Sequence, residues 1–596
     1  MNAETWPSLV QMFFDQADEK GDAPFMWAKH DGKYQPTSWR QAADEVIEVA
    51  RGLRSMGVET GDRVVLVSEN RPRWVVADLA IMAAGAITVP AYTTNTTADH
   101  KHIIENSGAK GAIVSTSKLA DPFLPAAHEA TDMDFAITLE AHRLQQELNV
   151  EVVGWDEMKR KGANSNWDVR AEVAKFQRTD RACIIYTSGT GGAPKGVVLS
   201  HGAILCNCVG ARDTLLKLGL GDEIFLCFLP LSHAYEHAAG LYFPISIAAQ
   251  IYYAEGVETL ATNLTEVRPT IMTAVPRLYE TLHTRITRGV RKAGGIKEKM
   301  FNRAGELGAK RYHDANSLSF GEKITDKVLD ALVRKKVAAR FDGRLKAMVS
   351  GGAPLNPEMG VFFTSLGLLI LQGYGQTEAA PVISVTQPEN NKIDTVGQPL
   401  TGVEVKIADD GEILVRGELL MEGYWQNEEA TNDTLRNGWL NTGDIGEIDA
   451  DGLLKITDRK KDIIVNSGGD NLSPARVEGL LTLEDELAQA MVYGDKRPHL
   501  VGLLVPDPEW MRDWAREHKR TNSLSVLADD PDFQKALGAA VDRVNKKVAN
   551  IEKVRRFMVA KDEFTIENEQ LTPTMKIRRH VIKKVYGDRL EAMYKT

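Results

Sequence analysis

The sequence predicts an α/β fold with a large N-terminal domain of layered α/β subdomains plus a β-rich subdomain, followed by a small α+β C-terminal domain. A chain of 596 residues exceeds what one ordinary hydrophobic core supports. Over about the first 350 residues, short apolar β-branched runs alternate with helical periodicity, which is typical of parallel strands layered with helices. From about residue 391 the pattern changes to short strands and tight turns.

The individual elements follow in chain order. Strands are expected at 63–70, ITVPAY (87–92), KGAIVS (110–115), ACIIYTSG (182–189) and EIFLCFLP (223–230). A helix is expected over 38–56. The most apolar run, 238–254, contains Pro244 and Gln250 and is too short to cross a bilayer, so it is expected to form a buried strand and helix.

The second half is expected to divide in two. The N-terminal domain is predicted to span 1–459, with its β-rich subdomain at about 391–459 and Asp-Gly turns at Asp410 and Asp451. The C-terminal domain is predicted to span 460–596. It contains a helix start at Ser473-Pro474 and two strands, AQAMVYGD (488–495) and HLVGLLVPD (499–507).

Bulk composition excludes several classes of protein. A net charge of -10 and a pI near 5.8 argue against nucleic acid as the main partner. The first 25 residues carry charges throughout and do not have the layout of a signal peptide. The four cysteines lie within one stretch, 183–227, without zinc-like spacing. We interpret them as buried hydrophobic side chains in a reducing cytoplasm.

The strongest local signal is YTSGTGGAPKG (186–196), directly after a predicted strand. Glycine backbones can close around an anion, hydroxyl groups add donors, and Lys195 supplies positive charge for a polyphosphate. The Walker pattern fails because Lys195 stands between Pro194 and Gly196, and the dinucleotide pattern fails because Pro194 replaces its last glycine. From the residues alone, an ordinary loop remains an alternative.

Further motifs follow in order along the chain. They are SGGAPL (350–355), GYGQTE (373–378), WLNTGD (439–444), TDRKKD (457–462) and LTPTMKIRR (571–579). Together with the glycine-rich loop they resemble the adenylate-forming superfamily, and within it the bacterial long-chain fatty acyl-CoA synthetases. The sequence departs from the family pattern at Gly191, where threonine is usual, and at Asp458, where glycine is common.

The resemblance implies ATP, Mg²⁺ and coenzyme A as ligands. The implied nucleotide site consists of Thr187, Ser188, Gly189, Thr190, Lys195, Gly352, Ala353, Pro354, Gln372, Gly373, Tyr374, Gly375, Thr377, Asp444, Ile456, Arg459 and Lys576. The implied catalytic residues are Lys576, Lys195, Thr377 and His233, and the implied metal ligands are Thr190 and Glu378. The implied coenzyme A loop contains Ser467, Gly468 and Gly469. The resemblance also implies a mobile C-terminal domain hinged at Lys461, and an acyl site near His233 and His237.

The implied reaction joins a fatty acid to AMP and then transfers the acyl group to coenzyme A. Three alternatives stay open: an acyl-AMP ligase that loads a separate carrier protein, an aryl or short-chain CoA ligase, and a lipid carrier without enzymatic activity. Intact nucleotide motifs speak against the last of these. Pyrophosphate release measured with and without coenzyme A separates the classes.

One local charge pattern differs from the acidic whole. Residues 285–346 hold 17 Lys or Arg against 7 Asp or Glu. Two readings stay open: solvated helices packed on the core, or a basic face that contacts an anionic membrane at its cytoplasmic side. The sequence therefore predicts a cytoplasmic protein, with peripheral membrane contact and a homodimer kept as hypotheses.

Overall fold

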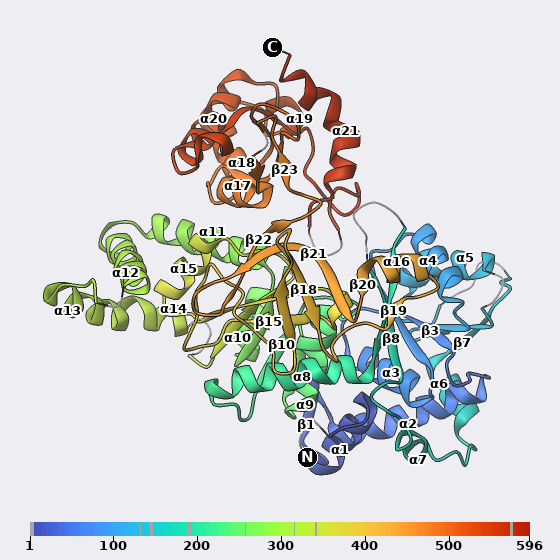
Figure 1. The fold of residues 1–596 in the computed structure, drawn as a ribbon. Coiled ribbons are helices and arrows are strands. Elements are labelled where there is room, and N and C mark those ends of the chain that lie inside the picture. Colours follow the sequence, from blue (N-terminus) through green and yellow to red (C-terminus); the bar gives the residue numbers. More distant parts are fainter. Residues whose placement is uncertain are drawn as a thin grey trace.

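The computed structural model of the chain describes residues 5–130, 133–142, 147–187, 193–256, 258–314, 316–339, 343–468, 470–572 and 576–595. A large body holds most of the chain, and a smaller body formed by the last part of the chain lies above it (Figure 1). The predicted fold class is confirmed. The predicted boundaries at 391, 459 and 460 stay predictions.

One of the two large sheets follows the strand order β19-β9-β8-β4-β3-β5-β6-β7. Its strands are β3 (Arg63–Val67), β4 (Ile87–Ala91), β5 (Gly111–Val114), β6 (Phe135–Thr138), β7 (Glu151–Gly154), β8 (Arg181–Thr187), β9 (Lys195–Ser200) and β19 (Gly423–Tyr424). Successive side chains of β3 enter different cores, as the period of two requires. Val64 and Leu66 face the core shared with α2 (Trp39–Ser55) and α3 (Pro72–Ala83), whereas Val65 and Val67 face α4 (Thr97–Ser107) and α5 (Ser117–Glu129).

The other large sheet follows the order β16-β15-β14-β13-β12-β10-β11-β1-β2. Its strands are β1 (Pro24–His30), β2 (Lys33–Ser38), β10 (Ile224–Cys227), β11 (Gln250–Tyr253), β12 (Ile271–Ala274), β13 (Ala347–Ser350), β14 (Ile370–Gly375), β15 (Val382–Val385) and β16 (Gln398–Pro399). The central strands from β11 to β14 run parallel. Ligands of such sheets bind outside the carboxyl ends of the strands, where β13 and β14 carry two of the predicted nucleotide motifs.

The apolar run at 238–254 is buried, as expected, and contains helix and strand. It forms the end of a π-helical segment, η2 (Glu236–Tyr242), then α9 (Phe243–Ser246) and β11. The long helix α8 (His201–Leu215) packs beside η2.

The predicted short strands after residue 391 form a separate sheet. It contains β17 (Glu404–Ile407), β18 (Glu412–Arg416), β20 (Leu435–Arg436), β21 (Trp439–Ile448) and β22 (Leu454–Arg459). Gly411 and Gly452 have φ angles of 83° and 76°. Both angles lie in the left-handed region that glycine enters without strain, which explains the Asp-Gly pairs in the sequence.

The smaller body builds its cores on the strand order β25-β26-β27. Its elements are β23 (Ile464–Val465), β24 (Asn471–Leu472), α17 (Pro474–Leu481), β25 (Leu487–Tyr493), β26 (Leu500–Pro506), α18 (Pro508–Glu517), α19 (Leu524–Leu527), α20 (Pro531–Asn545), β27 (Val554–Val559) and α21 (Arg579–Ala592).

A helical lobe projects from the side of the large body (Figure 1). It contains α11 (Pro276–Ala293), α12 (Gly295–His313), α13 (Phe320–Leu329), η3 (Asp330–Arg334) and α14 (Lys335–Ala338), with α15 (Pro357–Ser365) at its base. In the described part of the chain, no helix is both long enough and apolar enough to cross a membrane.

Candidate active site

A cleft of about 3080 Å³ lies between the two bodies and takes its walls from both. Every nucleotide-site residue predicted from the sequence lines this cleft, apart from three that lie outside the described residues. Those three are Ser188, Gly189 and Thr190. Motifs separated by hundreds of positions therefore meet at one place.

The glycine-rich sequence connects two strands that lie side by side. Strands β8 and β9 pair antiparallel, with Thr187 opposite Lys195. The Nζ of Lys195 lies 4.7 Å from the centre of the Tyr424 ring, on the adjacent strand β19. This cation–π contact holds the lysine at the edge of the cleft.

The loop after β13 and the end of β14 form a second wall. Gly352 (φ 80°), Ala353 and Pro354 follow β13, and Gln372, Gly373, Tyr374 and Gly375 end β14. Tyr235 lies beneath this wall and donates a hydrogen bond from its hydroxyl to the Val349 carbonyl (2.8 Å). A Cβ atom at Gly351 would approach the Tyr235 ring to 2.7 Å, so this close approach requires glycine. The Gln372 amide donates to the Thr395 carbonyl (3.2 Å) and supports the wall from behind.

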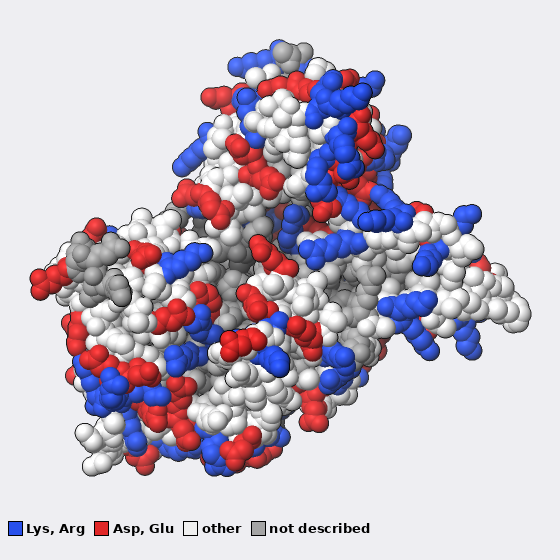
Figure 2. Space-filling view, turned by 180° about the vertical axis from the view of Figure 1, so that it is seen from behind, with Lys and Arg blue, Asp and Glu red and all other residues white. Residues whose placement is uncertain are grey.

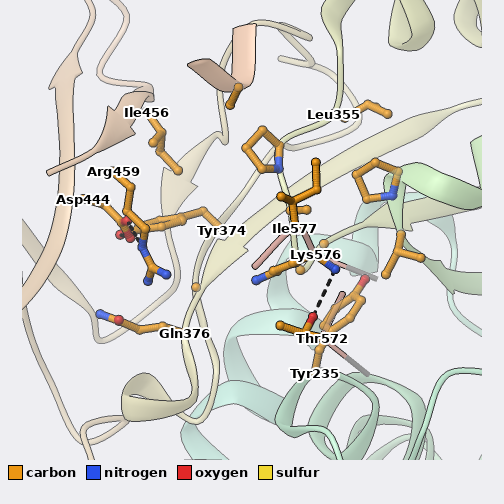
Figure 3. Close-up of a pocket in the computed structure, with 18 of the residues that line it drawn as sticks. Tyr235, Leu355, Tyr374, Gln376, Asp444, Ile456, Arg459, Thr572, Lys576 and Ile577 are labelled. Atoms are coloured by element: carbon orange, nitrogen blue, oxygen red, sulfur yellow. Dashed lines mark hydrogen bonds and ion pairs between the residues drawn. The ribbon is translucent and has the colours of Figure 1, made fainter. Parts of the chain in front are cut away.

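Asp444 is buried between two donors (Figure 3). The Tyr374 hydroxyl donates to Oδ2 (2.7 Å), and Arg459 Nε donates to Oδ1 (3.0 Å). Ile456, two positions before Asp458 on β22, lines the same part of the cleft. The three polar side chains form a pre-organised cluster that presents a carboxylate to polar hydrogens of a ligand.

Glu378 and Thr377 lie on a short 3₁₀ turn after β14 and line the cleft. The Tyr424 hydroxyl donates to Oε1 of Glu378 (2.7 Å), so one tyrosine holds both Glu378 and Lys195. Within the described residues there is no group of three or more His, Cys, Asp or Glu side chains placed to hold a metal. A single carboxylate fits Mg²⁺, which binds proteins through one or two carboxylates together with substrate phosphates.

Gln376 was not predicted from the sequence. Its side-chain Nε2 is buried and has no hydrogen-bond partner among the described residues, and the residue lines the cleft. Figure 3 shows it below the Tyr374–Asp444–Arg459 cluster in the view drawn. An unpaired buried donor costs free energy unless a ligand accepts from it, so Gln376 is a further candidate for binding a phosphate or carboxylate oxygen.

His233 lines the cleft as a neutral ring. Burial, and then the positive charge of Lys576, lower the pKa of His233 to about 3. The backbone N–H of Tyr235 donates to Nδ1 (3.1 Å), which leaves the proton on Nε2. His233 can therefore donate a hydrogen bond into the cleft, and its low pKa makes it a poor base.

The structure places His237 elsewhere. Its ring is buried, and Nε2 lies 3.0 Å from Oδ2 of Asp78 in the core. Among the described residues His237 does not line the cleft. His237 on η2 therefore points into the core, whereas His233, which precedes η2, lines the cleft. A role for His237 in an acyl site stays a prediction.

Apolar side chains line another part of the cleft. They come from α8, β10, η2 and α9 and include Ala211, Leu215, Phe225, Ala239 and Phe243. Sequence reasoning missed them because they differ in no way from ordinary core residues. Apolar walls of this kind suit a hydrocarbon chain.

Lys576 enters the cleft from the smaller body (Figure 3). Its backbone N–H donates to Oγ1 of Thr572 (3.0 Å). The side chain is exposed, but its exposed surface faces the cleft. Enclosure by the cleft walls, and then the positive charge of Arg459, lower the pKa of Lys576 to about 8. An anionic ligand would favour the charged form and reverse this shift.

The remaining predicted residues lie near the junction of the two bodies. Lys461 is exposed and lines the cleft, in the turn after β22 that leads to β23. Ser467 and Gly468 are exposed in the hairpin between β23 and β24 and are not part of the cleft lining. Gly469 lies outside the described residues. This arrangement brings Lys576, and not the predicted coenzyme A loop, to the site.

The four cysteines are free and buried, as expected. Burial is the first cause that raises the pKa of each thiol. Thiols of this kind are inert, so the cysteines take no part in the chemistry of the cleft.

Comparison with known proteins identifies the family. The model of the AMP-binding enzyme family matches residues 13–425, and that of the AMP-binding enzyme C-terminal domain matches 461–596. Long-chain-fatty-acid–CoA ligase FadD15 of Mycobacterium bovis is 34% identical, over 98% of this chain and 97% of that protein. The peroxisomal long chain acyl-CoA synthetase 7 of Arabidopsis thaliana is 31% identical, over 94% of this chain and 82% of that protein.

Solved structures share the fold. The adenylation domain of a carboxylate reductase from Mycobacterium chelonae superposes with a TM-score of 0.79 at 21% identity, covering 100% of this chain and 92% of that one. A benzoate CoA ligase from Burkholderia xenovorans gives 0.68 at 21% identity, covering 96% and 99%. The chain therefore belongs to the AMP-binding enzyme family, the adenylate-forming superfamily that its motifs predicted, beside the long-chain fatty acid–CoA ligases.

Proposed function

We propose that the protein is a long-chain fatty acyl-CoA synthetase. ATP and a fatty acid give acyl-AMP and pyrophosphate, and acyl-AMP and coenzyme A then give acyl-CoA and AMP. The observation that carries this proposal is the match, over nearly the whole chain and both bodies, to relatives named long-chain fatty acid–CoA ligases and acyl-CoA synthetases. The apolar wall beside the nucleotide motifs supports it.

In the first step a carboxylate oxygen attacks the α-phosphorus and pyrophosphate leaves. Lys576 would contact both the carboxylate and the α-phosphate, which offsets their repulsion and aligns the attack. Thr377 and Gln376 would donate to phosphate oxygens, and Lys195 would stabilise the departing pyrophosphate. Tyr374 would stack on adenine, and Asp444 would accept from the ribose hydroxyls. Thr190 and Glu378 would hold Mg²⁺, which neutralises phosphate charge when bound.

The neutral His233 would orient the substrate. A fatty carboxylate is already ionised at pH 7, so no base is needed to activate it. Its Nε2–H would donate to one carboxylate oxygen and leave the other oxygen for the attack. The proton stays on the imidazole throughout.

In the second step the coenzyme A thiolate attacks the acyl carbon, the bond from that carbon to the phosphate oxygen breaks, and AMP leaves with the electron pair. This step needs a thiol where Lys576 now lies. We propose that the smaller body rotates about Lys461 and brings Ser467, Gly468 and Gly469 to the cleft. A cytoplasmic location and a homodimer stay predictions.

The test measures the two half-reactions separately over a panel of acids from acetate to oleate, with benzoate included. We expect pyrophosphate release with long-chain acids and acyl-CoA only when coenzyme A is present. Preference for benzoate or acetate would favour an aryl or short-chain ligase. Pyrophosphate release without acyl-CoA would favour an acyl-AMP ligase that needs a carrier protein.

The role of Lys576 is tested in the same assays. Lys576→Ala should lower adenylation by several orders of magnitude and still convert synthetic acyl-AMP with coenzyme A, since the lysine acts only in the first step. Lys584→Ala, an exposed lysine on α21, is the matched control and should leave both half-reactions unchanged. Equal losses in the two half-reactions of Lys576→Ala would refute the assignment.

A further inference from the structure

The helical lobe carries an apolar stripe on its outer face. Phe320, Ile324, Val328 and Leu332 are 82%, 54%, 50% and 44% exposed. They recur every four residues along α13 and η3, so they follow one side of the helical rod. Large exposed apolar patches on folded proteins mark interaction sites.

The stripe is not a sign of loose packing, because the opposite side of α13 has its own core. Leu318, Leu329 and Val333 are buried against α12. Ser319 and Glu322 form a capping box at the start of α13. The helix therefore holds its position without the stripe, and its outer apolar residues remain free for a partner.

The ion pairs of the basic segment 285–346 show which of its cations are already bound within the protein. Arg334 is buried and donates to Asp326 (2.6 Å), the Ser365 carbonyl (2.7 Å) and the Ala304 carbonyl (2.9 Å). Arg311 also pairs with Asp326 (2.6 Å), and Lys310 pairs with Glu322 (2.9 Å). The whole segment 285–346 is thus not one basic face, and Arg334 has a structural role.

Four lysines next to the stripe remain exposed. They are Lys323 and Lys327 on α13, and Lys335 and Lys336 on α14. In the described part of the lobe, none of them pairs with an acidic side chain. Figure 2 shows the tip of this lobe, at the right of the view, as largely uncharged surface with blue side chains around it and little red. An apolar strip flanked by lysines is typical of helices that lie in a membrane interface.

We propose that the outer face of α13 and η3 docks on a bilayer that contains anionic lipids. The stripe would enter the acyl boundary, and the four lysines would contact the headgroups. This inference rests on the proposed function, because a long-chain fatty acid dissolves in the bilayer from which the enzyme would take it. A second copy of the chain is the less favoured occupant, since a two-fold contact would bring the same lysines face to face.

The test uses the full-length protein and vesicle co-sedimentation, without any activity readout. The vesicles are phosphatidylcholine alone or phosphatidylcholine with phosphatidylglycerol. Wild-type protein should bind the anionic vesicles and lose binding as salt rises. The triple variant Phe320→Ser, Ile324→Ser, Val328→Ser should bind at least about tenfold more weakly. The variant Lys323→Glu, Lys327→Glu, Lys335→Glu, Lys336→Glu should lose binding to anionic vesicles altogether.

Matched controls use exposed residues elsewhere. The control for the stripe variant is the triple variant Ile448→Ser, Val526→Ser, Val585→Ser. The control for the lysine variant is the quadruple variant Lys519→Glu, Lys535→Glu, Lys546→Glu, Lys584→Glu. Both should bind like wild type. Wild-type protein that ignores anionic vesicles at low salt, or controls that lose as much binding as the lobe variants, would overturn the proposal. A dimer that the stripe variants convert to monomer, without vesicle binding by wild type, would assign the face to a second copy instead.

Catalysis is tested apart from binding. The lobe variants should turn over detergent-dispersed fatty acid like wild type, because none of the changed residues lines the cleft. Vesicle binding without acyl-CoA formation would reject the proposed function and keep the membrane contact. Acyl-CoA formation without vesicle binding would reject the membrane contact and keep the proposed function.

Discussion

Glu236 carries a carboxyl group that is buried from solvent at the start of η2. The Thr273 hydroxyl donates to Oε2 (2.6 Å), while Oε1 has no hydrogen-bond partner among the described residues. Burial raises the pKa of Glu236 from its usual 4.5 to about 7. Thr273 lines the cleft, so this carboxyl group supports the wall of the site from behind.

This shifted pKa makes the stability of the fold depend on pH. Between pH 4.5 and 7 the folded state keeps the Glu236 proton while the unfolded state loses it. The stability that Glu236 contributes is therefore complete below pH 4.5 and is lost as pH rises through 7, by about 3 kcal/mol in all.

Glu236→Gln removes this titration. The free energy of unfolding of the variant, relative to wild type, should rise by up to about 3 kcal/mol between pH 5 and pH 8. Urea unfolding at several pH values measures it. The prediction concerns only how the difference in unfolding free energy changes with pH, so a cost of the substitution that is the same at every pH does not affect it. Parallel pH profiles of the two proteins would contradict the prediction.

At the scale of single elements, a buried polar contact connects η2 to α3. Asp78 on α3 accepts a hydrogen bond from the Tyr242 hydroxyl (2.5 Å), and its Oδ2 lies 3.0 Å from His237 Nε2. Tyr242 and His237 both lie on η2. The rings of Trp74 and Tyr242 pack edge-on against His237. Ala239 on η2 and Phe243 at the start of α9 line the cleft, so this contact fixes an apolar wall of the site.

His237→Ala should therefore act on stability and not on substrate choice. Truncating a large buried ring to alanine costs about 3–5 kcal/mol, and the change also takes a hydrogen-bond partner from Asp78, so the melting temperature should fall markedly. The preference among fatty acids of different length should stay unchanged. Tyr242→Phe, which removes only a hydroxyl, should cost less, about 1–3 kcal/mol. A shifted chain-length profile without loss of stability would instead assign His237 to the acyl site.

Across the whole molecule, local signals were predictable and long-range contacts were not. Strands such as 63–67 follow from continuous apolar runs, and the turns at Gly411 and Gly452 follow from Asp-Gly pairs. Tyr424 could not be placed behind Glu378, nor Asp78 beside His237, because such pairs lie 46 and 159 positions apart. The apolar pattern of α13 likewise does not reveal which of its two sides faces solvent.

The two bodies are held in this arrangement by cations of α11. Arg288 Nη2 lies 2.6 Å from Oδ1 of Asp507, and Arg288 also pairs with Glu509. Arg291 pairs with Asp485. Figure 1 shows α11 along the face of the large body that the smaller body approaches. These pairs coexist with Lys576 in the cleft, so rotation of the smaller body about Lys461 would break them.

The pairs should therefore favour the first half-reaction. The double variant Arg288→Ala, Arg291→Ala should lower ATP–pyrophosphate exchange about two- to tenfold, the range expected of partly exposed ion pairs. Conversion of synthetic acyl-AMP with coenzyme A should not fall, because we propose that the smaller body is rotated away from these pairs in that step. Arg416→Ala, which breaks a pair with Glu404 inside the β-rich sheet, is the control and should change neither rate. If the double variant slowed both half-reactions equally, the arginines would serve the fold of the lobe and not the choice between the two arrangements.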